Sequence, residues 1–297
     1  MTADPPVSAT LENPSDVPMV NQTPVYFFSH GGPTFMYSDR DEAGGDLGAF
    51  KVLRAIGKEI VENVRPKAVV VLSAHWQASH DQVEVNSAEH TDLIYDFYGF
   101  PSFMYREKYP NVGSKIIAQK VIDQLQGSGI KAKGVARGLD HGVFVPFKVL
   151  FPEFQDLKVP IIQVSLFDTD DPHQHFALGK ALAPLRDENI LIICSGMTVH
   201  NLREMGRYRA SVAPYAKKFD DMLETAISSD VGTVREDAMA NLIKTDEAHK
   251  SHPTKEHLLP IYVAAGAAYN EKGKRLYTNQ TSSVAWGEYQ FGSINND

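Results

Sequence analysis

The chain has 297 residues, and 29 lysines and arginines stand against 37 aspartates and glutamates, which gives a formal net charge of −8. Hydrophobic residues make up 43% of the chain and charged residues 22%, a globular composition that excludes global disorder. The acidic balance and the absence of basic runs argue against nucleic acid or a membrane surface as the partner.

Residues 1–23 are rich in Pro, Ser, Asp and Asn and are expected to form a mobile N-terminal arm. They lack the basic and apolar regions of a secretory signal, and no stretch reaches the ~18 consecutive apolar residues that span a bilayer. The single cysteine, Cys194, excludes an internal disulfide and a thiolate zinc site. We therefore expect a cytoplasmic protein in which His, Asp or Glu holds any metal.

Residues 24–297 alternate short apolar runs with longer amphipathic stretches. The runs expected to form buried strands are Val25–Phe28, Ala68–Leu72, Ile161–Leu166 and Ile190–Cys194. The expected helices are Ala49–Val64, Ser114–Leu125, Phe176–Leu185, Tyr215–Ile227 and Lys255–Tyr269, the last with Thr254 as its N-cap. This alternation predicts an α/β fold in one domain, a mostly parallel central sheet flanked by helices with the site at the carboxyl ends of the strands.

Two late segments have weaker patterns. Ser229–Asp246 suggests a pair of surface helices. Ser282–Trp286, followed by Tyr289–Phe291, suggests a terminal hairpin or an edge strand.

Three histidines follow predicted strands. His30 stands in FFSHGGP, His75 in LSAHW, and His200 in CSGMTVHN after the strand that ends at Cys194. If these strands are parallel, the three rings emerge at the carboxyl edge of one sheet, where open α/β proteins bind ligands. A single histidine in such a place is more often a polar residue at a strand end, but three together favour a shared site.

Two further histidines are candidates. His257, in SHPTKEHLLP, is a possible fourth ligand, with Glu256 and His252 as local alternatives that spacing does not separate. His141, in GLDHG, is either a functional loop histidine oriented by Asp140 or an exposed residue of an Asp-Gly turn. The other histidines are expected on the surface, namely His80, His90, His173, His175 and His249.

An aromatic segment runs from Tyr95 to Pro101. It is expected either to line a pocket for a flat ring, with Tyr98 and Phe100 as substrate-binding residues, or to pack beneath a loop. Other candidates have supporting roles. They are Trp76 as packing behind His75, Ser29 and Ser73 as residues that orient the neighbouring histidines, and Arg203 and Arg207 as partners of a substrate carboxylate.

At these segments the chain resembles the class III extradiol ring-cleaving dioxygenases, in particular their branch similar to 4,5-DOPA dioxygenase. The shared motifs are SHGGP, LSAHW, YDFYGFP, GLDHG, SGMTVHNL and PTKEHLLP. They occur in the family's order from about residue 24 to about residue 290, and ordered motifs are far more specific than any one alone.

The resemblance implies one divalent metal bound by His30, His75 and His257. It implies His200 as a further metal contact or as the acid–base residue, and His141 as a residue that touches the substrate oxygens. The wider superfamily binds Fe(II) with two histidines and a glutamate, whereas here a histidine takes the place of the glutamate, which also suits zinc. The cofactor is therefore expected to be Zn(II) as isolated or Fe(II) for dioxygenase activity.

The same resemblance implies an aromatic diol, DOPA-like or other, that O2 opens to a muconic semialdehyde. Two alternatives use the same residues. One is a zinc hydrolase with His200 as proton shuttle, and the other is a binding module that kept the fold without redox chemistry. We rank the dioxygenase first, because a module with no need for metal has no physical reason to keep all four histidines. Monomer and dimer are both compatible with the sequence.

Overall fold

The computed structural model describes residues 22–40, 45–152 and 154–294. Residues 1–21 of the expected N-terminal arm therefore lie outside the described residues. Thr23, at the end of that segment, is buried, and its hydroxyl donates to the carbonyl of Ile190 at 2.9 Å. The part of the chain described contains no helix long and apolar enough to cross a membrane.

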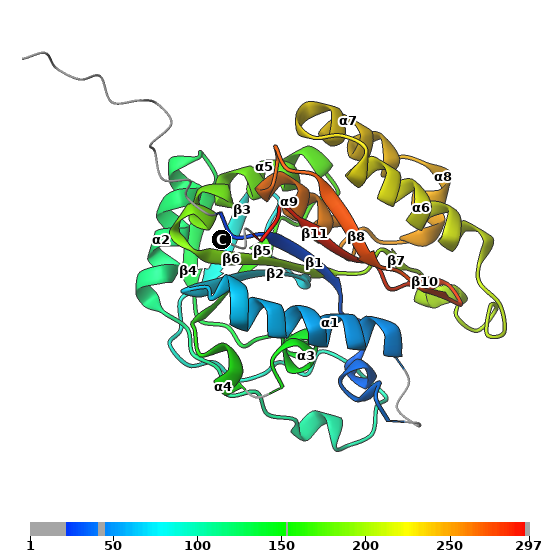
Figure 1. Cartoon of the computed structure of the whole chain (residues 1–297), viewed down its shortest axis with the longest axis horizontal. Coiled ribbons are helices and arrows are strands. Elements are labelled where there is room, and N and C mark those ends of the chain that lie inside the picture. The colour runs from blue at the N-terminus through cyan, green and yellow to red at the C-terminus, as the bar shows by residue number, and fades with distance from the viewer. Residues whose placement is uncertain (1–21, 41–44, 153, 295–297) are drawn as a thin grey trace, which may run out of the picture.

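Eight strands of the described residues form the main sheet. They are β1 (Val25–Ser29), β2 (Ala68–Gln77), β3 (Gln82–Asn86), β4 (Lys131–Val135), β5 (Ile161–Leu166), β6 (Ile190–Gly196), β8 (Gly273–Tyr277) and β11 (Glu288–Phe291). Their order across the sheet is β4-β3-β5-β2-β6-β1-β11-β8 (Figure 1). The central strands β5, β2, β6 and β1 are parallel, while β11 and β8 continue the sheet in the antiparallel sense. The predicted α/β fold with a mostly parallel sheet is confirmed.

The central strands are mostly apolar because both faces of the sheet are covered. Side chains alternate between the faces, so Phe27 and Val70 pack into one core while Phe28 and Val71 pack into the other. All four are fully buried. The continuous apolar runs that predicted these strands therefore reflect two hydrophobic cores, one on each side of the sheet.

Helices form a layer on each side of the sheet (Figure 1). One layer contains α1 (Leu47–Glu59) and α3 (His141–Leu150), with the short α4 (Phe154–Leu157) following α3. The other contains α2 (Lys115–Gly127), α5 (Pro172–Leu182) and α9 (Leu259–Ala267). A further group, α6 (Pro214–Ser228), α7 (Gly232–Leu242) and α8 (Asp246–Ser251), lies beside β8 at one end of the molecule.

The helix after His257 begins later than predicted. It starts at Leu259 rather than Lys255, its N-cap is Leu258, and the hydroxyl of Thr254 donates to Glu256 at 2.9 Å instead of capping the helix. Pro260 explains the difference, because a proline fits only the first turn of a helix and would otherwise clash with the preceding turn. His257 therefore lies in the turn before α9.

The C-terminal segment forms both a small sheet and a strand of the main one. The small sheet has the order β7-β10-β9, from β7 (Val199–His200), β9 (Gln280–Thr281) and β10 (Val284–Ala285). The suggested hairpin between Ser282–Trp286 and Tyr289–Phe291 is wrong, because β10 pairs with β9 and β7 while β11 pairs with β1 and β8. The following strand β11 lies between β1 and β8, so it is an interior strand and not an edge strand.

Candidate metal centre

Three of the predicted histidines meet at the carboxyl edge of the sheet. His30 directly follows β1, His75 lies near the end of β2, and His257 comes from the turn before α9. The centroid of the His75 ring lies 4.9 Å from that of His30 and 4.8 Å from that of His257. One nitrogen of each ring lies within 4.8 Å of the others, an arrangement that could hold a metal ion.

Each of these rings has an oxygen acceptor beside Nδ1. The pairs are His30 with the carbonyl of Gly31 at 2.8 Å, His75 with Asp96 Oδ2 at 3.2 Å, and His257 with Glu256 Oε1 at 2.9 Å. Because these oxygens only accept hydrogen bonds, the Nδ1 atoms carry the protons in the neutral rings. Metal-binding histidines characteristically have such partners, which fix the tautomer and the orientation of the ring.

The proton on Nδ1 leaves a lone pair on each Nε2. The Nε2 atoms of His75 and His257 are 3.2 Å apart, and the buried Nε2 of His30 has no hydrogen-bond partner among the described residues. Two bare imidazole nitrogens gain nothing from facing each other, but a divalent cation satisfies such lone pairs. The three histidines therefore fit one divalent metal.

The same surroundings keep the rings of His30 and His257 neutral. Burial, with the neighbouring histidines as a further cause, holds the pKa of His30 and of His257 well below the ordinary value. A neutral imidazole is the form that binds a metal.

The backbone conformation of Gly31 makes the hydrogen bond between its carbonyl and Nδ1 of His30 possible. Its φ of +55° is a left-handed conformation, which turns its carbonyl back toward the His30 ring. A Cβ at this position would lie 2.1 Å from the ring of Trp286. The turn after β1 therefore requires a glycine for both its backbone angle and its space.

His200 and His141 lie against the three-histidine cluster. The ring of His200, on β7, stacks on that of His257 with centroids 3.6 Å apart and an interplanar angle of 16°. The His200 ring makes no hydrogen bond to any described residue. Burial and the nearby His75 and His141 lower the pKa of His200 to about 4.

His141 is the first residue of α3, and its ring centroid lies 3.9 Å from that of His75. It is buried, so the exposed-turn alternative is wrong. Its Nδ1 lies 2.8 Å from Asp96 Oδ1, and its pKa is lowered mainly by burial, which outweighs the effect of that carboxylate. The two bonds to Asp96 have a reciprocal effect: although burial raises the pKa of its carboxyl, hydrogen bonds from His141 and His75 hold that pKa well below its usual range.

Asp140 does not orient His141, which corrects the prediction. Its carboxylate is buried beneath the site and accepts from Ser73 Oγ at 2.7 Å, Arg137 Nη1 at 2.8 Å and Gln163 Nε2 at 2.6 Å. Ser73 Oγ in turn accepts from the backbone N–H of His75 at 3.1 Å. As the N-cap residue of α3, Asp140 points toward β2 while His141 points into the cluster, so the two side chains diverge.

The aromatic segment reaches the site through Phe97. Phe97 is buried and meets His141 edge-on at 5.7 Å between ring centroids. Phe100 packs on Phe97 at 5.6 Å, and its ring approaches Gly32. The side chain of Tyr98 is 88% exposed, so the structure brings Phe97 rather than Tyr98 against the histidines.

The other candidates have structural contacts. Trp76 is buried, as expected, with the Arg137 guanidinium 4.5 Å from its ring centroid. Ser29 donates to the carbonyl of Gly287 at 2.9 Å, which ties β1 to the C-terminal segment. Arg207 pairs with Glu204 at 3.0 Å on the surface, and Arg203 is exposed.

Two histidines outside the cluster are buried. His252 Nε2 lies 2.9 Å from the carbonyl oxygen of Thr198, so of the three alternatives in its segment His257 is the one that faces the cluster. His175 was predicted on the surface but is fully buried, with Nδ1 2.8 Å from the carbonyl of Asp171. Residues two apart on a helix point in different directions, so His173 can face outward while His175 faces the core.

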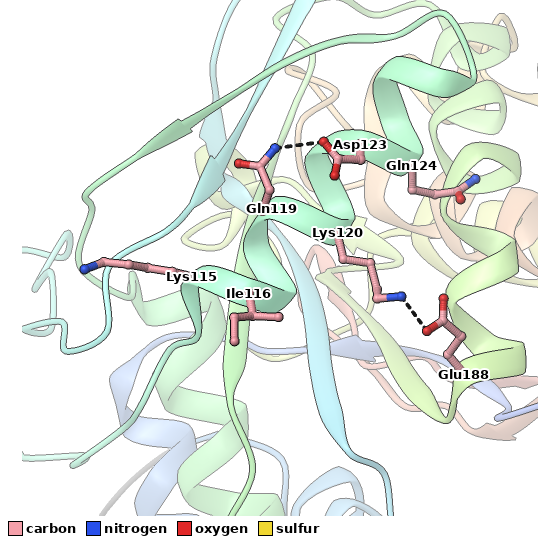
Figure 2. A pocket seen from close by; sticks show the side chains of 7 residues that line it. All are labelled: Lys115, Ile116, Gln119, Lys120, Asp123, Gln124 and Glu188. Atoms are coloured by element: carbon pink, nitrogen blue, oxygen red, sulfur yellow. Dashed lines mark hydrogen bonds and ion pairs between the residues drawn. The ribbon is translucent and has the colours of Figure 1, made fainter.

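A surface hollow of about 720 Å³ lies elsewhere, along α2 (Figure 2). Lys120 reaches across it to Glu188 at 2.6 Å, and Gln119 donates to Asp123 at 2.8 Å. None of the clustered histidines lines this hollow. It is a charged depression of the surface and has no part in the candidate site.

Sequence reasoning missed Asp96. Asp96 accepts hydrogen bonds from two histidine rings that lie far from it in the sequence. The available signal was its place as the one charged residue within the aromatic run YDFYGFP. A carboxylate at such a position needs a polar partner once the aromatic side chains pack around it.

Comparisons with known proteins agree with this arrangement. Residues 24–291 match the family described as the catalytic LigB subunit of aromatic ring-opening dioxygenase. A 4,5-DOPA dioxygenase extradiol from Beta vulgaris is 36% identical over 274 residues, which cover 90% of this chain and 96% of that protein. A 4,5-DOPA dioxygenase extradiol-like protein from Schizosaccharomyces pombe is 38% identical over 262 residues, covering 84% and 86%.

The fold has a match among solved structures as well. An uncharacterized protein from Escherichia coli K12 superposes with a TM-score of 0.73 at 26% identity, covering 91% of this chain and all of that one. Together these matches place the chain in the branch that the sequence motifs indicated. The chain belongs to the LigB family and is an aromatic ring-opening dioxygenase of the class III extradiol type, similar to 4,5-DOPA dioxygenases.

Proposed function

We propose that this chain is a metal-dependent extradiol dioxygenase that uses O2 to open a catechol, DOPA-like or another aromatic diol, to a muconic semialdehyde. One observation carries the proposal: three histidines, each with Nδ1 beside an oxygen acceptor, bring one ring nitrogen each to within 4.8 Å of the others. The names of the relatives support the substrate class.

His30, His75 and His257 are the residues that would hold the metal. Bound Fe(II) would supply a redox path between the aromatic diol and O2, whereas Zn(II), which suits the same donor set, has no redox chemistry. The protein's part is to keep the rings in the form and orientation that bind a metal. Burial lowers the pKa of His30 and His257 and so keeps these two rings neutral, and the Nδ1 hydrogen bonds fix the ring orientation.

His200 is the proposed acid–base residue. A pKa lowered to about 4 leaves its ring neutral near pH 7, so it can take the proton of a diol hydroxyl. Its stacked position on His257 puts it beside the proposed ligand set, and it is free of other hydrogen bonds within the described residues. After the ring opens, the same nitrogen can return the proton to the product.

His141 is the proposed substrate contact. Because Nδ1–H points to Asp96, its Nε2 is free to accept a hydrogen bond from a substrate hydroxyl. Phe97 and Phe100 offer flat apolar surface for an aromatic ring, with Tyr98 as a contact at the rim. We place this chemistry in the cytoplasm, where the buried free Cys194 would stay reduced.

Metal exchange tests the proposal. The protein is stripped of metal, loaded with Fe(II) under nitrogen, mixed with L-DOPA or catechol, and then exposed to oxygen. We expect oxygen uptake together with a yellow ring-opened product in the Fe(II) sample and none in a matched Zn(II) sample. His200→Ala should slow ring opening by ~100- to 10,000-fold, the usual contribution of acid–base catalysis, while still binding metal.

Two results would overturn the proposal. Turnover by the Zn(II) form without oxygen would favour a zinc hydrolase whose metal is held by the same three histidines. Full activity of His200→Ala would remove His200 from the proton transfers.

A further inference from the structure

We propose that Asp96 is a positioning residue that fixes the tautomer and orientation of His75 and His141 together. One carboxylate would then fix the orientation of a metal ligand relative to that of a substrate-facing histidine. This inference rests on the proposed function, because it assigns a role to the residue that joins two members of that site.

The contacts of Asp96 are shared between its two oxygens. Oδ1 accepts from the ring Nδ1 of His141 at 2.8 Å and from the backbone N–H of His141 at 3.0 Å. Oδ2 lies 3.2 Å from Nδ1 of His75. The carboxylate of Asp96 therefore supplies one oxygen as acceptor to the Nδ1 of each ring.

Backbone pairing brings this carboxylate to the histidines. Leu93 and Leu139 form a parallel bridge, in which Ile94 donates to the carbonyl of Leu139 at 2.8 Å. This pairing lays the segment before Asp96 alongside the segment that leads into His141. The hydroxyl of Tyr95 donates to the carbonyl of Glu107 at 2.6 Å and holds the same loop from its other side.

The other two proposed ligands have separate partners. His30 uses the carbonyl of Gly31, and His257 uses Glu256, whose Oε1 also accepts from the hydroxyl of Thr254. In the described part of the chain, Asp96 is the carboxylate that two histidine rings share. Glu256 is therefore a suitable comparison for Asp96, since its carboxylate contacts the ring of one proposed ligand, His257.

Amide substitutions distinguish the effect of the negative charge from the effect of the acceptor oxygens, because Asn and Gln lose the charge and keep one oxygen. In Asp96→Asn, the one remaining oxygen must stay toward His141, where both a ring N–H and a backbone N–H point at it. The amide NH2 then faces Nδ1 of His75 and favours the tautomer with its proton on Nε2, so that Nε2 no longer has a lone pair for a metal. Glu256→Gln keeps its oxygen for both of its donors and loses only the charge.

Two measurements on the full chain test this inference. Zn²⁺ affinity, determined by chelator competition, is compared among wild type, Asp96→Asn and Glu256→Gln. We expect Asp96→Asn to weaken Zn²⁺ binding by ~10- to 100-fold, the usual effect of losing a ligand's outer hydrogen bond, and Glu256→Gln to weaken it much less. Long-range ¹H–¹⁵N spectra of the metal-free protein should show Nδ1–H on His75 and His141 in wild type, and Nε2–H on His75 in Asp96→Asn.

Several outcomes would overturn the inference. Equal losses in the two variants would mean that charge alone matters, and no loss in Asp96→Asn would mean that Asp96 positions nothing. A wild-type spectrum with Nε2–H on either ring would overturn it even if Asp96→Asn failed to fold. Wild-type protein that binds no Zn²⁺ would instead contradict the proposed metal site, while the two tautomers would still decide the role of Asp96.

Discussion

At the scale of single residues, the site depends on the backbone conformation of Gly31. Its left-handed φ of +55° directs its carbonyl to His30 Nδ1, and Trp286 occupies the space that a side chain would need. A residue with no catalytic atom of its own thereby determines which nitrogen of His30 is free. This geometry explains why the first glycine of the SHGGP motif, Gly31, is a glycine.

Gly31→Ala should destabilise the protein and weaken Zn²⁺ binding. The left-handed conformation alone costs a residue with a Cβ about 1–3 kcal/mol, and the added methyl group must also displace Trp286. Urea unfolding of the metal-free protein measures the first effect, and chelator competition measures the second. Gly127→Ala is the matched control, because its Cβ would meet no atom within 4 Å. Equal stabilities of the two variants would contradict this account of Gly31.

At the scale of elements, the end of β2 and the start of α3 are joined by Asp140. Its buried carboxylate receives hydrogen bonds from Ser73 on β2, from Gln163 on β5, and from Arg137 just before α3. Arg137 also donates to the carbonyl of His75 at 3.3 Å. Three elements that carry or support the clustered histidines are thus fixed by one buried polar network.

Asp140→Asn should lower the free energy of unfolding by about 1–3 kcal/mol, because an amide NH2 then faces buried donors that lose their acceptor. Urea unfolding measures the loss. Asp171→Asn is the control, since Asp171 is the exposed N-cap of α5 and asparagine caps helices about equally well. If Asp140→Asn proved as stable as the control, the network would not hold these elements together.

Elements were predictable wherever a local pattern determined them. The four central strands follow from continuous apolar runs, and His30 and His75 followed from their places at strand ends. The start of α9 was missed because Pro260 overrides the apparent cap at Thr254. Asp96 was not assigned, because its partners His75 and His141 are distant from it in the sequence and lie beside it only in the folded chain.

At the scale of the whole molecule, buried histidines outside the ligand set link stability to pH. Burial lowers the pKa of His175, and burial lowers that of His252 to about 3. In the unfolded chain both titrate near ~6.5, so below that pH the unfolded state binds more protons than the folded state. Their contribution to stability is therefore complete above ~6.5 and is lost as the pH falls toward the folded values.

Urea unfolding from about pH 8 to about pH 5 should show a free energy of unfolding that decreases below ~6.5. In His175→Gln this decrease should be shallower, because one of the groups that gains a proton on unfolding is gone. His173→Gln, on the exposed side of the same helix, is the matched control for the substitution itself. Stability that rises on acidification would contradict the assignment of these histidines as neutral and buried.

In the proposed site, His30, His75 and His257 hold the metal that ring opening requires. Among the described residues, two other groups could hold an ion: His75 with Asp96 and His141, and His200 with Glu256 and His257. Anomalous diffraction from crystals of the zinc-loaded protein distinguishes the three directly. We predict one ion with Nε2 of His30, His75 and His257 each at about 2.0–2.1 Å, the usual zinc–nitrogen distance. An ion bound by either of the other groups, with His30 unliganded, would contradict the claim.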